Sequence, residues 1–123
     1  MKLDDALAPQ WGRRTFAVLI PIHTARRRQH EWLREKRDRV QRLAVAETCK
    51  AMLERPALPC SIRLTRCAPR TLDSDNLQAA LKATRDSVAE WLGIDDADPR
   101  VRWLYEQEKT KTYGVRLEVL REL

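Results

Sequence analysis

Several acidic side chains and one lysine between positions 72 and 96 have the types and spacing that could hold a divalent cation. Asp73 and Asp75 stand one residue apart, and the adjacent pair Asp95 and Asp96 follows a stretch typical of a helix. Carboxylates brought together repel one another unless a cation lies among them. Oxygen ligands with no Cys or His between them favour Mg²⁺ or Mn²⁺. In a basic protein this pattern suggests phosphodiester cleavage, in which the metal activates water and a lysine steadies developing charge.

A helix is expected between the two groups of acids. Asp75 suits its N-cap, because an N-cap carboxylate accepts hydrogen bonds from the first backbone N–H groups, and Asp73 is expected in the preceding loop. The side chains expected on the buried face recur every three or four residues and are Leu77, Leu81, Thr84, Val88 and Trp91 or Leu92. At about 100° per residue, Asp75, Lys82 and Asp86 form one line opposite that face. Gly93 suits the turn that ends the helix.

Each of these residues also has a simpler interpretation. One Asp before a helix is usually only a cap, and two Asp after a glycine usually form a solvated turn. A lysine on the exposed face of a helix, such as Lys82, is usually just solvated. The sequence alone leaves both the metal site and these local roles open.

Four strands and two helices are predicted along the chain. Apolar runs or alternation predict strands over residues 15–22, 60–69, 100–109 and 114–120. A helix within residues 23–56, ended by Pro56, has apolar positions near helical spacing at Trp32, Val40, Leu43, Ala44, Ala46 or Glu47, and Met52. The segment "TKTYG" suggests a hairpin turn between the last two strands. The order β-α-β-α-β-β predicts an α/β (α+β) fold, a small mixed sheet of about four strands with two helices on one face.

This order also suggests how the acids meet. Asp73 and Asp75 leave the end of one strand, and Asp95 and Asp96 enter the start of another. If those two strands are neighbours, we expect the four carboxylates to converge at one edge of the sheet.

Length and composition indicate one domain over residues 1–123, with residues 1–12 loosely held. The three cysteines are odd in number and lack metal-site spacing, so reduced thiols in a cytoplasm are expected. No signal peptide or membrane span is recognisable, so no membrane partner is expected.

The net charge of +6 is concentrated in one segment. Residues 26–42 contain eight Lys or Arg and three Asp or Glu. Such a segment suits DNA phosphates, and the residues expected to contact them are Arg26, Arg27, Arg28, Arg34, Lys36, Arg37 and Arg39. A further group is expected to extend this patch and comprises Arg13, Arg14, Arg63, Arg66, Arg70, Lys109 and Lys111. The alternative is a solvated helix face with ion pairs between residues four apart.

The stretch "LDSDNLQAALKATRDSVAEWLGIDD", residues 72–96, resembles the core signature of the RusA-type Holliday junction resolvases, which are common in phages and prophages. The resemblance extends to about residue 118. It implies a homodimeric endonuclease that cuts four-way or otherwise branched DNA in a bacterial or phage-infected cell. It also implies Mg²⁺, or Mn²⁺ as a substitute, held by Asp73, Asp75 and Asp96.

The resemblance assigns the remaining residues of the motif as well. Asn76 follows Asp75 as in the family, and Asp95 and Asp86 are possible supporting residues. The family's lysine stands one helical turn after the second aspartate, where this chain has Ala79. Lys82 becomes the equivalent if a small insertion precedes it. Two alternatives to the nuclease are a DNA-binding protein without catalysis, and a structural or regulatory phage protein whose acids only cap and solvate.

Overall fold

The computed structural model describes the backbone of residues 13–20, 31–52 and 54–121, and the side chains of residues 35–51 and 54–120. The elements in chain order are β1 (Arg13–Ile20), α2 (Glu31–Met52), β2 (Cys60–Ala68), α3 (Ser74–Ala80), α4 (Lys82–Leu92), β3 (Val101–Lys109) and β4 (Gly114–Arg121). The expectations for residues 1–12 and for Arg26, Arg27 and Arg28 lie outside the described residues.

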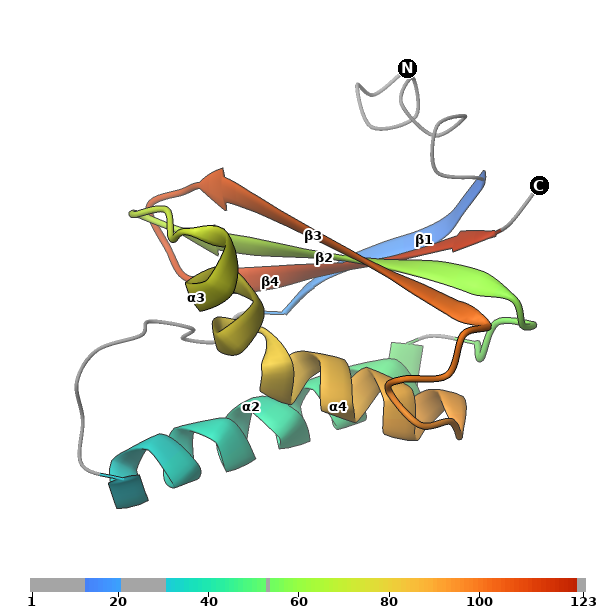
Figure 1. The fold of residues 1–123 in the computed structure, drawn as a ribbon, viewed down its shortest axis with the longest axis horizontal. Helices are drawn as coiled ribbons and strands as arrows, with labels where there is room; N and C mark the ends of the chain where they lie inside the picture. Colours follow the sequence, from blue (N-terminus) through green and yellow to red (C-terminus); the bar gives the residue numbers. More distant parts are fainter. Residues whose placement is uncertain (1–12, 21–30, 53, 122–123) are drawn as a thin grey trace.

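The strands form one mixed sheet in the order β1-β4-β2-β3. β2 pairs with β3 in parallel and with β4 antiparallel, and β4 also pairs antiparallel with β1. α2 and α4 lie side by side on one face of the sheet, and α3 leads into α4 at an angle (Figure 1). The predicted class, helices on a small mixed sheet, is confirmed, but the second predicted helix is divided in two at Leu81.

The predicted hairpin between β3 and β4 is wrong, because β2 lies between these two strands. The connection over residues 110–113 therefore crosses the end of β2, where the Thr110 N–H donates to the Ala68 carbonyl at 3.0 Å. It spans two strand spacings, about 9.5 Å, which four residues reach easily. All nine residues of β2 are buried, as suits a central strand, and its pairing on both edges outweighs the local turn signal.

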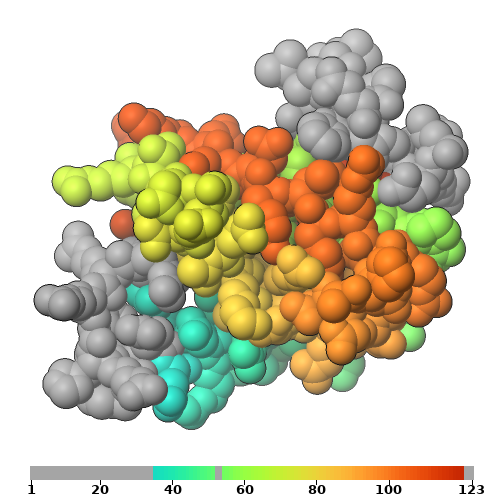
Figure 2. Space-filling view, viewed as in Figure 1, coloured from blue at the N-terminus to red at the C-terminus, as the bar shows by residue number. Residues whose placement is uncertain are grey.

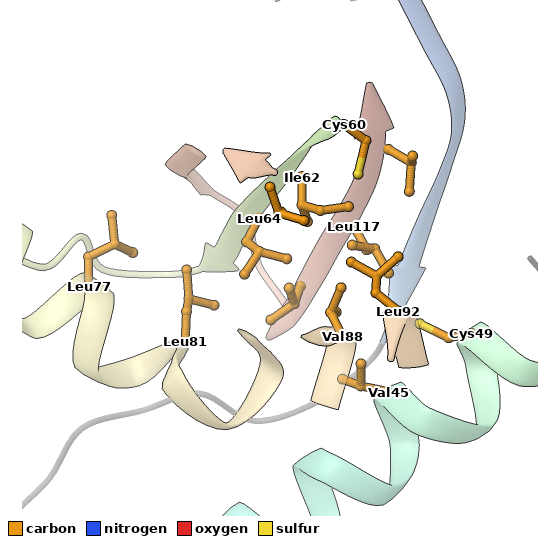
Figure 3. Close-up of a cluster of buried hydrophobic side chains, with 13 residues drawn as sticks. Val45, Cys49, Cys60, Ile62, Leu64, Leu77, Leu81, Val88, Leu92 and Leu117 are labelled. Atoms are coloured by element: carbon orange, nitrogen blue, oxygen red, sulfur yellow. The ribbon is translucent and has the colours of Figure 1, made fainter. Parts of the chain in front are cut away.

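The core lies between the sheet and the helices (Figure 3). The sheet contributes residues such as Ile62, Leu64 and Leu117, and α2 contributes Val45 and Cys49. The stripe predicted for the second helix is confirmed, since its buried members are Leu77, Leu81, Thr84, Val88 and Leu92. Trp91 is partly buried against the same core.

The buried face predicted for α2 is wrong at several positions. Val40 and Leu43 are 58% and 59% exposed, and Ala46 and Glu47 are exposed as well. The buried positions among the described side chains are instead Gln41, Val45 and Cys49, with Ala44 partly buried. The reason is a polar contact, because Gln41 Nε2 donates to Thr84 Oγ1 at 2.9 Å and lies 3.5 Å from the Ala80 carbonyl. The side chains of Trp32 and Met52 lie outside the described set.

The three thiols, Cys49, Cys60 and Cys67, are buried and form no disulfide. Burial raises the pKa of Cys49 to about 11 and also raises the pKa of Cys67, so both favour the neutral thiol. Within the described ranges, none of the helices combines the length and apolar character needed to cross a bilayer.

Candidate functional site

Asp73, and not Asp75 as predicted, is the N-cap of α3. Its extended backbone places Oδ1 2.9 Å from the Asn76 N–H, and its Oδ2 accepts a bond from Asn76 Nδ2 at 3.1 Å. An N-cap must stand one residue before the first helical position and reach the third, which Asp73 does and Asp75 does not. Asp75 lies exposed in the first turn of α3, where a negative charge suits the helix dipole.

Gln107 on β3 fixes the backbone that leads into α3. The Leu72 N–H donates to Gln107 Oε1 at 2.9 Å, and Gln107 Nε2 donates to the Leu72 carbonyl at 2.7 Å. This pair of bonds holds the residue before Asp73 against the second half of β3.

Asp95 and Asp96 lie in the loop over residues 93–100 and have different surroundings. Gly93 opens the loop in the left-handed conformation, as predicted, with φ of 73°. Asp95 Oδ1 accepts the Ala97 N–H at 2.9 Å, which is the turn role of an Asp and leaves the side chain exposed. The Asp96 carbonyl accepts Arg85 Nη2 at 2.6 Å and Trp103 Nε1 at 3.1 Å.

The predicted route by which the acids meet is wrong. β2 and β3 are neighbours but parallel, so the end of β2 (Ala68 beside Lys109) and the start of β3 (Val101 beside Cys60) lie at opposite ends of the sheet. Asp96 returns toward α3 only because its loop folds back over β3 as far as Trp103. The backbone positions of residues 103 and 107, which anchor the two acidic segments, are about 13 Å apart along the strand.

A hollow of about 240 Å³ lies between α3, α4 and β3. Its lining residues are Gln78, Ala79, Lys82, Arg85, Asp96 and Tyr105. Lys82 and Asp96 therefore both border this hollow, and Ala79 in its wall stands one helical turn after Asp75. In Figure 2 the yellow surface of α3 and α4 meets the orange surface of the loop and β3 on this face.

Asp96 also borders a second hollow of about 300 Å³, lined further by Asp86, Ala89, Glu90, Ile94 and Asp95. Asp86 is paired with Lys82 Nζ at 3.2 Å and with Arg42 Nη2 at 3.3 Å. These contacts confirm that Lys82 and Asp86 share a helix face, and they join that face to the basic helix α2.

The candidate metal ligands fit Mg²⁺ in the chemistry of their donors, because Asp73, Asp75 and Asp96 offer only carboxylate oxygens. The bonds from Asn76 to Asp73 leave further lone pairs on both of its carboxylate oxygens. Among the side chains that the structure describes, no three His, Cys, Asp or Glu stand together as a group that could hold a metal.

The basic residues divide into a surface group and a buried group. Lys36 and Arg39 are exposed on α2, and Arg37 is partly exposed, with its Nη1 atom buried and lacking a hydrogen-bond partner. Arg34 lies on α2, but its side chain is outside the described set. The predicted extension of the patch is wrong for Arg63 and Arg66, which are only 8% and 3% exposed.

The burial of Arg63 and Arg66 follows from the central place of β2. Arg63 forms a two-pronged pair with Glu118 on β4, at 2.8 Å and 2.6 Å. Arg66 donates to the Arg70 carbonyl at 2.7 Å, and burial lowers its pKa. Arg70, Lys109 and Lys111 are exposed, and the side chains of Arg13 and Arg14 are outside the described set.

Sequence reasoning missed Arg85 as a site residue. Its guanidinium lies 4.8 Å from the centre of the Trp103 ring, and its Nη1 donates to the Tyr105 hydroxyl at 2.7 Å. One signal was present, because Arg85 stands three residues after Lys82 and so shares its side of the helix. Its partners on β3 and in the loop depend on tertiary packing, which local sequence does not reveal.

Comparison with protein-family models finds no matching family, and comparison with curated proteins finds no match.

Proposed function

We propose that this chain is a Mg²⁺-dependent endonuclease that cuts branched DNA, four-way junctions among them, as a homodimer. The observation that carries the proposal is the hollow shared by Lys82 and Asp96, whose wall includes α3, the helix capped by Asp73. The resemblance of residues 72–96 to the RusA-type signature supports the same assignment. Symmetric cleavage of two strands requires two sites, which a two-fold dimer supplies.

The roles follow the proposed chemistry. Asp73, Asp75 and Asp96 would hold the metal, which would neutralise phosphate oxygens and activate water. Lys82 binds the phosphate and steadies the charge that develops on it.

The helix break before Lys82 supports its equivalence to the family's lysine. α3 ends at Ala80, and α4 restarts at Lys82, so the place of the lysine depends on the junction at Leu81. Leu81 has φ of −99° and ψ of 2°, outside regular helix geometry. A helix interrupted there can accommodate extra residues between Asp75 and the lysine while keeping Lys82 at the hollow.

The surroundings suit a large polyanion. Asp73, Asp75 and Lys82 are exposed, so a duplex can approach them without entering a deep pocket. The ion pair between Arg42 and Asp86 connects this face to α2, which presents Lys36 and Arg39 to solvent. Phosphate contacts from such residues position DNA without selecting its sequence.

A second candidate is a protein that binds branched DNA without cutting it. The ion pair between Lys82 and Asp86 favours this alternative, because it occupies the lysine that catalysis needs. An exposed pair of this kind is weak, however, and a phosphate can displace it.

The test is cleavage of a labelled four-way junction and of linear duplex, with Mg²⁺ and with EDTA. The variants are Asp75→Asn and, as a control for the loss of one negative charge, Glu106→Gln, an exposed position on β3. We expect paired symmetric nicks that disappear with EDTA, fall at least about 100-fold in Asp75→Asn and persist in Glu106→Gln. Tight junction binding with no cleavage in Mg²⁺ or Mn²⁺ would contradict the nuclease and favour the binding protein.

A further inference from the structure

Arg85 connects three consecutive parts of the chain, namely α4, the loop over residues 93–100 and β3. It lies in the middle of α4, is partly buried, and reaches the loop over residues 93–100 and two aromatic side chains of β3. The Arg85 guanidinium lies over the Trp103 ring and donates to the Tyr105 hydroxyl on the strand. It also donates to the Asp96 backbone carbonyl in the loop.

The contact with Asp96 is made mainly through the backbone. Arg85 Nη2 lies 2.6 Å from the Asp96 carbonyl oxygen, whereas Arg85 Nε lies 3.6 Å from the Asp96 carboxylate. The longer distance is beyond a hydrogen bond. Arg85 therefore anchors the peptide of Asp96 through a short hydrogen bond, while its ion pair with the Asp96 carboxylate is longer and leaves that side chain 41% exposed.

The rest of the loop is held mostly by its own turns. Asp95 Oδ1 accepts the Ala97 N–H, and Asp98 Oδ1 accepts the Arg100 N–H, both at 2.9 Å. Within the described part of the chain, Arg85 and Trp103 tie Asp96 to the body of the fold. Loss of Arg85 would remove one of these anchors and the partner that packs on the other.

We infer that Arg85 is a positioning residue, which fixes the Asp96 peptide against Trp103 and so places the Asp96 carboxylate at the hollow that it shares with Lys82. Its consequence for metal use rests on the proposed function. The anchoring itself does not, because it concerns only groups of this chain.

The chemistry requires arginine at this position. A planar guanidinium can stack on the Trp103 ring while its edge donates to two separate oxygens. A lysine is a point charge on a flexible stem and cannot maintain all three contacts. Arg85→Lys therefore keeps the charge and loses the geometry, which makes it a more informative variant than a truncation.

The first test follows the Trp103 indole N–H by ¹H–¹⁵N NMR in the metal-free protein, with its signal assigned from Trp103→Phe. The variants are Arg85→Lys, Arg85→Met and Tyr105→Phe, and the control is Arg100→Met, which removes an exposed arginine of the same loop that pairs with Asp98 at 2.8 Å. We expect the indole N–H of both Arg85 variants to shift and to exchange with solvent at least about tenfold faster, because its bond to the Asp96 carbonyl is weakened. Arg100→Met should leave it unchanged.

An indole signal in Arg85→Lys and Tyr105→Phe that matches the wild type in shift and exchange rate would overturn the inference. Tyr105→Phe removes only a hydroxyl and keeps the ring, so it decides the question if Arg85→Met does not fold. We expect Tyr105→Phe to give a smaller change than Arg85→Lys, because it removes one contact of the three.

The second test measures the Mg²⁺ concentration that gives half-maximal junction cleavage. We expect Arg85→Lys to raise it about 10-fold to 100-fold, the range for residues that orient metal ligands, and to recover near wild-type cleavage at high Mg²⁺. Wild-type Mg²⁺ dependence in a variant with a displaced Trp103 signal would overturn the link between anchoring and metal use. If the wild type cuts no substrate, the proposed function fails, and the NMR test still decides the role of Arg85.

Discussion

Two contacts between an arginine and an acidic residue show how differently this fold uses the same chemistry. Arg63 and Glu118 pair across the central strands β2 and β4, with side chains 10% and 0% exposed. Both carboxylate oxygens of Glu118 accept from Arg63, and Arg116 Nε lies 3.5 Å from one of them. Arg85 and Asp96 are 25% and 41% exposed, and their short bond goes to a backbone carbonyl.

A carboxylate can bind a ligand only if part of it remains accessible to solvent. Glu118 is enclosed by its partners, so we assign it a structural role. Asp96 is held by its backbone, so its carboxylate stays near the hollow without being neutralised by a two-pronged ion pair. Net positive charge and acidic motifs in the sequence do not distinguish these situations, because burial decides which charges meet a ligand.

The largest expected effect comes from breaking the enclosed pair. Glu118→Ala removes both carboxylate acceptors from the buried Arg63 guanidinium, which costs about 3–5 kcal/mol of the free energy of unfolding. Urea denaturation measures this loss. The double variant Arg63→Met with Glu118→Leu should recover most of the loss, because apolar side chains of similar volume often replace a buried pair without penalty. A loss below about 1 kcal/mol in Glu118→Ala would show that the pair is not enclosed in this way.

A smaller effect is expected at Asp73, which has both a structural contact and a proposed chemical role. Asp73→Ala removes the cap of α3 and should lower the free energy of unfolding by about 1 kcal/mol. Asp73→Asn retains a capping side chain and should lower it by only roughly a few tenths of a kcal/mol. Thermal unfolding separates the two variants. Under the proposed function both lose cleavage, so a stable Asp73→Asn that still cuts junctions would leave Asp73 as a cap only.

The smallest effect is expected at the exposed pair of Asp98 and Arg100. Hydrogen bonds from Arg100 lower the pKa of Asp98 from 3.8 to about 2. A carboxyl whose pKa is lowered in the folded state stabilises the protein above its unfolded pKa, and this contribution is lost as the pH falls from about 4 through about 2. Between pH 5 and 8 it is constant. A ¹³C-carboxyl NMR titration should show a midpoint near 2 that rises in Arg100→Met, and an ordinary midpoint in the wild type would contradict the contact.

Sequence patterns predicted several elements of the fold and one side of the candidate site. Leu77, Leu81 and Val88 are buried as their spacing predicted, because a helix that packs on one side must repeat its apolar residues at its own period. Lys82 and Asp86 share a face for the same geometric reason. The pattern did not distinguish Asp73 from Asp75 as the cap, since both residues are Asp and the choice depends on where the helix begins.

Local sequence patterns therefore predict where the strands lie, which side of α3 and α4 is buried, and which residues have oxygen or nitrogen atoms suited to a metal and to phosphate. The tertiary structure decided that β2 separates β3 from β4, that Gln41 and not Val40 faces the core, that Arg63 is buried, and that Asp96 returns to the hollow beside Lys82. These two sets of features differ in how far apart in the sequence the interacting residues lie. Periodicity and capping depend on neighbours a few residues apart, whereas the pairing of strands and the burial of a charge depend on partners tens of residues away that compete for the same place. The anchoring of the loop depends on how α4 and β3 pack against it.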